Sequence, residues 1–316
     1  MTTTRTTTTR RELYDGLTSP LRGEPIEPPA LPSLWRTGEP WRGRVQAAQR
    51  SGTAERVRRG IYGPPSAPGA DDEAALLAAI VAVDARMSTT FAFSHRSAGV
   101  LAGLWVPRRG DAVVDVTQAG PISSPAHADP TLHRYRSDLP DDEVRDFLGL
   151  PVTSVERTAV DCARTLPLAR ALAVVDSALV LGADRGEMER ILQRLRGRRG
   201  VRAAREIVAL GSDAVGSPAE SVVRAEIVAA GLPAPSTLVV VDTPGGPYEL
   251  DMGWRDRRVG VEVHGRVKYL RGADPVAEAV RREHVFEAGW SVVDVRTGQP
   301  VWQYLPRIRR AFAARL

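Results

Sequence analysis

The sequence predicts a multi-domain α/β protein, and three observations support this prediction. The chain has 316 residues, more than the roughly 100 to 200 residues of one compact domain. Its middle part has the spacing of apolar residues that is typical of helices. From Ser217 onward the order of predicted elements is helix, strand, strand, strand, helix, strand, as in an α/β unit.

Composition limits the functional classes. A net charge of +5 and a pI near 9.8 favour a polyanionic partner such as DNA. The single cysteine, Cys162, excludes an internal disulfide and a multi-cysteine metal site, and it fits a reducing cytoplasm. No apolar run reaches the ~20 residues of a membrane span, and the first residues lack the apolar core of a secretory signal. We therefore expect a cytoplasmic protein that does not contact membranes.

The N-terminal part predicts a tail followed by a small helix-and-hairpin unit. Residues 1–40 are rich in Thr, Pro, Gly and Arg and poor in apolar side chains, which predicts a flexible tail. Residues 41–68 begin with helix formers and continue into a Gly- and Pro-containing turn, which predicts a helix followed by a β-wing.

Residues 69–212 predict an α/β middle domain. We expect helices at 71–87, 94–104, 154–166, 168–181 and 185–210, and strands at 112–116 and 131–136. The basic stretch 194–202 contains two glycines and predicts a break in the last helix. Ser94 and His95 resemble a nucleophile and base, but no nucleophile elbow surrounds them, which favours a helix start.

Residues 213–316 predict the C-terminal α/β domain. Ser217 as N-cap, Pro218 at the first helical position and Glu220 two residues later form a capping-box pattern for a helix that ends near Gly231. Strands are expected at 238–242, 248–254, 259–263 and 291–296, with a helix at 277–288.

Acidic residues on the predicted strands form the candidate site. A hairpin through residues 255–258 places Asp251 and Glu262 at one end of the sheet, where two carboxylates repel each other unless a cation lies between them. Glu262 also interrupts the apolar run Val-Gly-Val-Glu-Val, where an acid needs a partner. Glu220 can complete the group. Alternatively, Asp251 caps a strand and Glu262 pairs with a nearby arginine.

Five blocks of this domain resemble, in order, the very-short-patch-repair-like endonuclease domain of the PD-(D/E)xK superfamily, which ends many actinobacterial proteins. They are residues 217–224, 230–235, 248–254, 261–269 and 287–293. The resemblance implies a PD-(D/E)xK-type mixed sheet flanked by helices. It also implies Mg²⁺ held by Asp251 and Glu262 with support from Glu220, and a metal-bound water that attacks DNA phosphorus.

Two departures from that pattern concern catalysis. His264 stands where these domains usually have Asp and the wider superfamily has Lys, and Glu283 lies in a block where Asp is common. His264 can be a ligand, a base or a structural residue, and Lys268 can replace the missing cation. A nuclease-like domain that binds without cutting therefore stays open.

The preceding part of the chain resembles proteins with a winged-helix region of the AbiEi antitoxin type, here degenerate. The matching stretches are residues 58–62, 94–104, 152–161 and 173–179. The resemblance implies DNA as a partner, with a cognate toxin possible. In a winged helix the recognition helix enters the major groove, and the basic residues of the wing contact phosphate. The candidate contacts are Arg50, Arg56, Arg58 and Arg59; the alternative is an ordinary solvated basic surface.

Three functional hypotheses follow. The first is a DNA-binding protein whose C-terminal domain hydrolyses DNA phosphodiesters with Mg²⁺. The second is a non-catalytic transcriptional repressor or type IV antitoxin-like regulator with a vestigial nuclease fold. The third is a module that binds only proteins.

Overall fold

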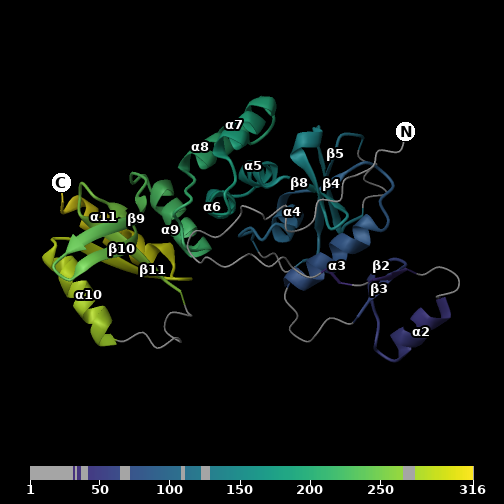
Figure 1. Cartoon of the computed structure of the whole chain (residues 1–316), viewed down its shortest axis with the longest axis horizontal. Coiled ribbons are helices and arrows are strands. Elements are labelled where there is room, and N and C mark those ends of the chain that lie inside the picture. Colours follow the sequence, from purple (N-terminus) through teal and green to yellow (C-terminus); the bar gives the residue numbers. More distant parts are fainter. Residues whose placement is uncertain are drawn as a thin grey trace.

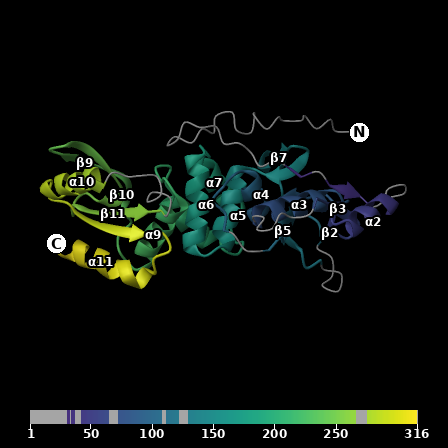
Figure 2. The ribbon, with the colours of Figure 1, turned by 90° about the horizontal axis from the view of Figure 1, so that it is seen from below.

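The structure, a computed structural model, describes residues 31–32, 34–36, 42–64, 72–107, 111–121, 129–265 and 275–315. The molecule is elongated (Figure 1). The N-terminal helix and hairpin lie at one end, the C-terminal sheet lies at the other, and a helical region lies between them, as a second view also shows (Figure 2).

The N-terminal unit is one helix and a small antiparallel sheet. Helix α2 (Arg42–Arg50) is followed by the hairpin of β2 (Glu55–Arg58) and β3 (Ile61–Gly63). The predicted hairpin is therefore present. Strand β1 (Trp35–Arg36) pairs with β3, so this part of the predicted tail 1–40 is instead a strand of the sheet. Residues 1–30 lie outside the described residues.

A five-stranded mixed sheet follows, with order β6-β5-β4-β8-β7. Its elements are α3 (Asp72–Asp84), β4 (Ala92–Phe93), α4 (His95–Leu101), β5 (Val114–Gln118), β6 (Leu132–Arg136), β7 (Val144–Phe147) and β8 (Leu150–Thr153), with a 3-10 turn at Asp141–Glu143 before β7. Leu76 and Ile80 of α3 are fully buried with Phe93, Val114 and Val116 of the sheet. The strands β4, β7 and β8 were not predicted, because each has at most four residues.

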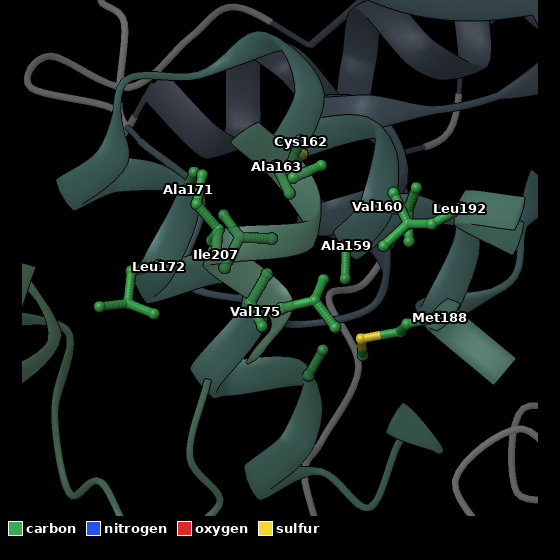
Figure 3. Packing of buried hydrophobic residues seen from close by; sticks show 14 of the residues in the cluster. Ala159, Val160, Cys162, Ala163, Ala171, Leu172, Val175, Met188, Leu192 and Ile207 are labelled. Carbon is green, nitrogen blue, oxygen red and sulfur yellow. The ribbon is translucent and has the colours of Figure 1, made fainter. Parts of the chain in front are cut away.

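Four helices form the largest core: α5 (Val155–Thr165), α6 (Leu168–Val180), α7 (Arg185–Arg194) and α8 (Val201–Leu210). Figure 3 shows Ala159 and Cys162 of α5, Val175 of α6, Met188 of α7 and Ile207 of α8 packed around one another. The predicted break between the last two helices is real, because the N-cap of α8 is Gly200 in the left-handed region, with φ 82°.

A buried ion network joins this helical core to the five-stranded sheet. Arg157 of α5 is 1% exposed and donates to Asp161 at 2.7 Å and to Glu143 before β7. Arg194 of α7 also contacts Glu143. Ser154 caps α5 by accepting from the Arg157 amide at 3.1 Å. Arg157 and Asp161 therefore have a structural role, because buried charges paired in this way are costly to separate.

The C-terminal domain is a mixed sheet between helices. Its elements are α9 (Pro218–Ala229), β9 (Ser236–Thr243), β10 (Gly246–Trp254), β11 (Val259–His264), α10 (Pro275–Glu287), β12 (Ser291–Arg296) and α11 (Val301–Ala313). The order is β12-β11-β10-β9, in which β11 and β12 are parallel and the other pairs are antiparallel. Helix α11 was not predicted, because Pro306 lies inside it and proline disfavours helix interiors.

The two faces of this sheet are covered by different helices. Helices α9 and α11 contribute Val223, Ile227, Tyr304 and Ile308 to the core on one face, and Val285 of α10 packs on the other. Helix α9 also reaches the middle domain, where Ala225 joins the helical core and Arg224 forms a buried ion pair with Asp176 of α6. The predicted boundary at 213 therefore precedes a helix that belongs to both cores.

Candidate functional site

Three potential metal ligands converge on the α10 side of the C-terminal sheet. They are Glu262 and His264 on β11 and Asp294 on β12, and one ligand atom from each lies within 4.8 Å of the others. His264 Nε2 lies 2.6 Å from Asp294 Oδ1 and 3.9 Å from Glu262 Oε2. Glu262 and Asp294 occupy paired positions of the two parallel strands, and strand alternation then points His264 to the same face. We call this group the acid–histidine cluster.

Two arginines of α10 neutralise the cluster. Arg281 Nη2 donates to Glu262 Oε1 at 2.6 Å, and Arg282 Nη2 lies 3.4 Å from Asp294 Oδ1. The hydrogen bond from His264 lowers the pKa of Asp294, burial opposes this shift, and Arg282 reinforces it. The side chain of Glu262 is only 7% exposed, so its charge needs such a partner. An arginine partner for Glu262 was the alternative expectation for this residue.

Asp251 lies beside the cluster at an irregular point of β10. Leu250 packs on the α10 side and Met252 on the opposite side, so the alternation of side chains slips at Asp251. The regular pairing of β10 with β11 starts at Met252, and Asp251 Oδ2 instead accepts from the Val263 amide at 2.6 Å. The carboxylate of Asp251 therefore rests against the backbone of β11, next to Glu262.

Glu220 uses its carboxylate at the start of its own helix. Glu220 Oε1 accepts from Ser217 Oγ and Oε2 accepts from the Gly216 amide, both at 2.8 Å, while Ser217 Oγ accepts from the Glu220 amide at 3.3 Å. This is the predicted capping box. Neither Glu220 nor Asp251 belongs to the group of converging ligands found among the described residues. Lys268 lies outside the described residues.

Asp294 is the member of the cluster that sequence reasoning missed. The signal was present, because Asp294 interrupts the apolar strand Ser-Val-Val-Asp-Val as Glu262 interrupts its own strand. What the sequence did not indicate is that β11 and β12 are adjacent and parallel, which aligns the two acids. The second departure from the family pattern is the block around Glu283. In that block His284 Nδ1 lies 3.2 Å from the Tyr248 hydroxyl, away from the cluster.

The donor types allow two kinds of cation. Carboxylate oxygens such as those of Asp251 and Glu262 are the hard donors that Mg²⁺ takes, so these two residues fit the ion by chemistry. One imidazole and two carboxylates, the set in the acid–histidine cluster, suit borderline ions such as Mn²⁺ or Zn²⁺. In either case Arg281 and Arg282 compete with the cation for the same oxygens.

A cavity of about 450 Å³ opens directly beside the cluster. Glu262 and Asp294 lie in its wall, and Leu250, Val285, Trp290 and Val292 form an apolar floor. Pockets of about 300 to 1,000 Å³ with an apolar lining and a few polar groups are typical of ligand sites. The cluster is therefore accessible to a ligand from the side of α10.

The arginines predicted to contact DNA lie on α2 and the hairpin at the other end of the molecule. Arg50, Arg56 and Arg59 are exposed. Arg58 is different, because its side chain is only 14% exposed and forms an ion pair with Asp129. Three of the four predicted side chains are therefore exposed to solvent, and the fourth is partly buried in an ion pair with Asp129.

Fold and site define a multi-domain protein with mixed α/β sheets. Residues 97–210, which include the helical core, match the family described as AbiEi antitoxin C-terminal domain. No helix in the described ranges combines the length and the apolar character needed to cross a bilayer.

Two curated relatives from Mycobacterium tuberculosis are similar to this chain: Uncharacterized protein MT2308 of strain CDC 1551 / Oshkosh and Uncharacterized protein Rv2248 of strain ATCC 25618 / H37Rv. Each is 32% identical over 149 residues, which is 46% of this chain and 55% of the relative. The chain thus spans about half the length of these relatives. The crystal structure of RV2827C protein from M. tuberculosis matches 62% of this chain and 71% of its own at 16% identity, with a TM-score of 0.38, which is too low to support an inference.

Proposed function

We propose that this chain is a DNA-binding regulator of the toxin–antitoxin type, with a middle domain that binds a cognate toxin. The observation that supports the proposal is the match of residues 97–210 to the AbiEi antitoxin C-terminal domain. That segment contains most of the largest buried core, so the match concerns a folded unit. The second support is the exposed basic surface of α2 and its hairpin, which suits a phosphate backbone.

A salt titration of duplex binding tests the DNA part of the proposal. Each phosphate contact contributes about −0.9 to the slope of log affinity against log salt concentration. The triple variant Arg50→Ala, Arg56→Ala, Arg59→Ala is expected to bind more weakly and to reduce that slope by about 2.7. Arg58→Ala is expected to change the slope less, because Asp129 already neutralises Arg58.

The matched control removes three other exposed arginines, Arg196, Arg198 and Arg199, from the turn between α7 and α8. Its duplex affinity and salt slope are expected to equal those of the wild type. Equal losses in both triple variants would mean that binding is non-localised charge attraction, and the assignment to α2 and the hairpin would fail. The toxin part of the proposal is tested by co-expressing this chain with a candidate cognate toxin. Relief of the toxin's growth arrest is expected, and persistent arrest would reject that part.

A second candidate function is metal-dependent hydrolysis of DNA phosphodiesters by the C-terminal domain. The observation that favours it is the acid–histidine cluster beside an open cavity. Asp251 and Glu262 would hold Mg²⁺, and the bound ion would supply Lewis acidity and an activated water. Glu220, predicted to support the ion, instead uses its carboxylate in its own capping box. In this role His264 orients Asp294 through their hydrogen bond, and Lys268 is the predicted additional cation.

Cleavage assays separate the two candidates. Plasmid, single-stranded and nicked DNA are incubated with the full chain and either Mg²⁺ or Mn²⁺. Glu262→Gln is expected to abolish cleavage, whereas Glu283→Gln, an exposed acid of α10, is expected to cleave like the wild type. Cleavage that survives Glu262→Gln would reject the assigned site. If the wild type cleaves none of these substrates under any condition, the nuclease function is rejected and only the regulator function remains.

A further inference from the structure

The rim of the cavity carries an aromatic ring that the fold does not cover. Phe286 of α10 lines the cavity, yet it is 75% exposed. The core of α10 is already formed by Val285 beside it, so Phe286 contributes little to packing in the chain alone. Its position at the mouth of a concave site with an apolar floor allows the ring to stack on a ligand that enters the cavity.

The charged residues of the cavity include more arginines than acids. Arg281, Arg282 and Arg315 line it together with Glu262 and Asp294. Arg282 forms an ion pair with Asp294 at 3.4 Å, yet its side chain is 57% exposed and reaches solvent at the cavity. In the part of the chain that the structure describes, Arg315 is exposed and has no carboxylate within ion-pair distance. A ligand of this cavity therefore combines a flat apolar group, which covers Phe286, with negative charge, which the arginines bind.

From this combination we propose that the cavity between α10 and β12 binds an unstacked base of a single-stranded nucleic acid. Phe286 stacks on the base, and Arg282 and Arg315 contact the adjoining phosphates. Stacking on aromatic side chains next to a basic groove is how proteins hold single strands without reading their sequence. Bases inside a duplex cannot reach such a cavity, because they are stacked and paired.

The cavity is separate from the duplex-binding surface of α2 and its hairpin. The cavity proposal rests on the proposed function only in that the chain binds nucleic acid. Figure 1 shows α10 and α2 at opposite ends of the molecule. The two surfaces can therefore be inactivated independently, and the failure of one proposal does not imply the failure of the other.

Fluorescence anisotropy of the full chain with labelled oligothymidylate and oligouridylate tests the proposal. Phe286→Ala is expected to weaken binding of both by roughly 5- to 100-fold, the equivalent of losing one base stack. Phe286→Trp is expected to retain the affinity, because it keeps an aromatic face, whereas Phe286→Leu is expected to lose it. Arg315→Ala is expected to reduce the salt slope for single strands by about 0.7.

The matched control is Trp302→Ala at the start of α11, since Trp302 is a similarly exposed aromatic residue, 70% exposed, that does not line the cavity. It must bind like the wild type. Equal melting temperatures of Phe286→Ala and the wild type establish that the fold is unchanged, as expected for so exposed a side chain.

Three results would overturn the proposal: wild-type affinity in Phe286→Ala, wild-type affinity in Phe286→Leu, or a polyglutamate peptide that binds with the same dependence on Phe286, which would assign the cavity to an acidic protein segment. The triple arginine variant of α2 and the hairpin must keep its affinity for single strands. If the triple arginine variant loses only duplex binding, the duplex-surface proposal and the cavity proposal both stand. If Phe286→Ala does not change single-strand binding while the wild type still binds duplex DNA, only the cavity proposal fails.

Discussion

Removing Arg224 tests how strongly the C-terminal domain is joined to the helical core. Arg224 Nη2 donates to both carboxylate oxygens of Asp176, at 2.6 and 2.7 Å, and Nη1 donates to the Leu210 carbonyl at 2.7 Å. The side chains are 4% and 0% exposed. Arg224→Met keeps most of the volume but leaves a buried, unpaired carboxylate, which typically costs about 3 to 5 kcal/mol in free energy of unfolding.

The pH dependence of this loss has a defined sign. Burial raises the pKa of Asp176, and the charge and hydrogen bonds of Arg224 oppose that rise. A carboxyl whose folded-state pKa is raised stabilises the fold most at low pH, and the contribution is lost as the pH increases through the folded-state pKa. Removing Arg224 raises that pKa further. The deficit of Arg224→Met is therefore expected to be widest at neutral pH and to narrow on acidification.

Urea unfolding at neutral and at mildly acidic pH measures both effects. The double variant Asp176→Asn with Arg224→Met is expected to regain much of the stability, because neither partner remains buried alone, and to lose the pH dependence. Arg202→Met is the control, since the side chain of Arg202 is 96% exposed. A pH-independent deficit, or a double variant as unstable as the sum of the single variants, would refute the reasoning.

Three other predictions concern a turn, the acid–histidine cluster and the cysteine. Gly200→Ala is expected to destabilise the fold by at least about 2 kcal/mol more than Gly197→Ala. Both glycines have positive φ, but only a Cβ at Gly200 meets a backbone carbonyl, at 2.2 Å; equal unfolding midpoints would contradict this. The hydrogen bond from His264 lowers the pKa of Asp294. The Asp294 carboxylate therefore stabilises the fold at pH values above the usual carboxyl pKa, and this contribution is lost as the pH falls through the lowered pKa. Asp294→Asn should therefore be less stable at neutral pH and approach the wild type in acid, and a constant difference would count against the ion pair. Burial raises the pKa of the Cys162 thiol well above its usual value, so a thiol reagent should label the protein at least tenfold faster in denaturant than in buffer; fast labelling of the native chain would show that α5 is not packed as described.

The sequence predicted most of the helices and the longer strands, because these depend on local patterns. The capping box at Ser217 and Glu220 and the apolar stripe of α6 are read within a few residues of chain. Short strands such as β4 have too few residues to show a pattern. Helix α11 was concealed by Pro306, whose local preference is overridden when Tyr304 and Ile308 are buried against the sheet.

The candidate site was likewise predicted only in part from the sequence. Glu262 was recognised from the sequence alone, because a charge inside an apolar strand requires a partner. Which partner each acid takes depends on which elements become neighbours. Glu262 accepts a hydrogen bond from Arg281 of α10. Asp294 contacts His264 only because β12 lies parallel to β11.

Local order along the chain therefore determined that an acidic site would lie near the ends of these strands. Tertiary packing alone decided that Asp294 joins Glu262 and His264 there, and that Arg58 is paired with Asp129. The physical reason is range. Capping and alternation act over a few residues, whereas the ion pairs of a buried site join residues tens of positions apart, and their geometry exists only when the sheets and helices have packed.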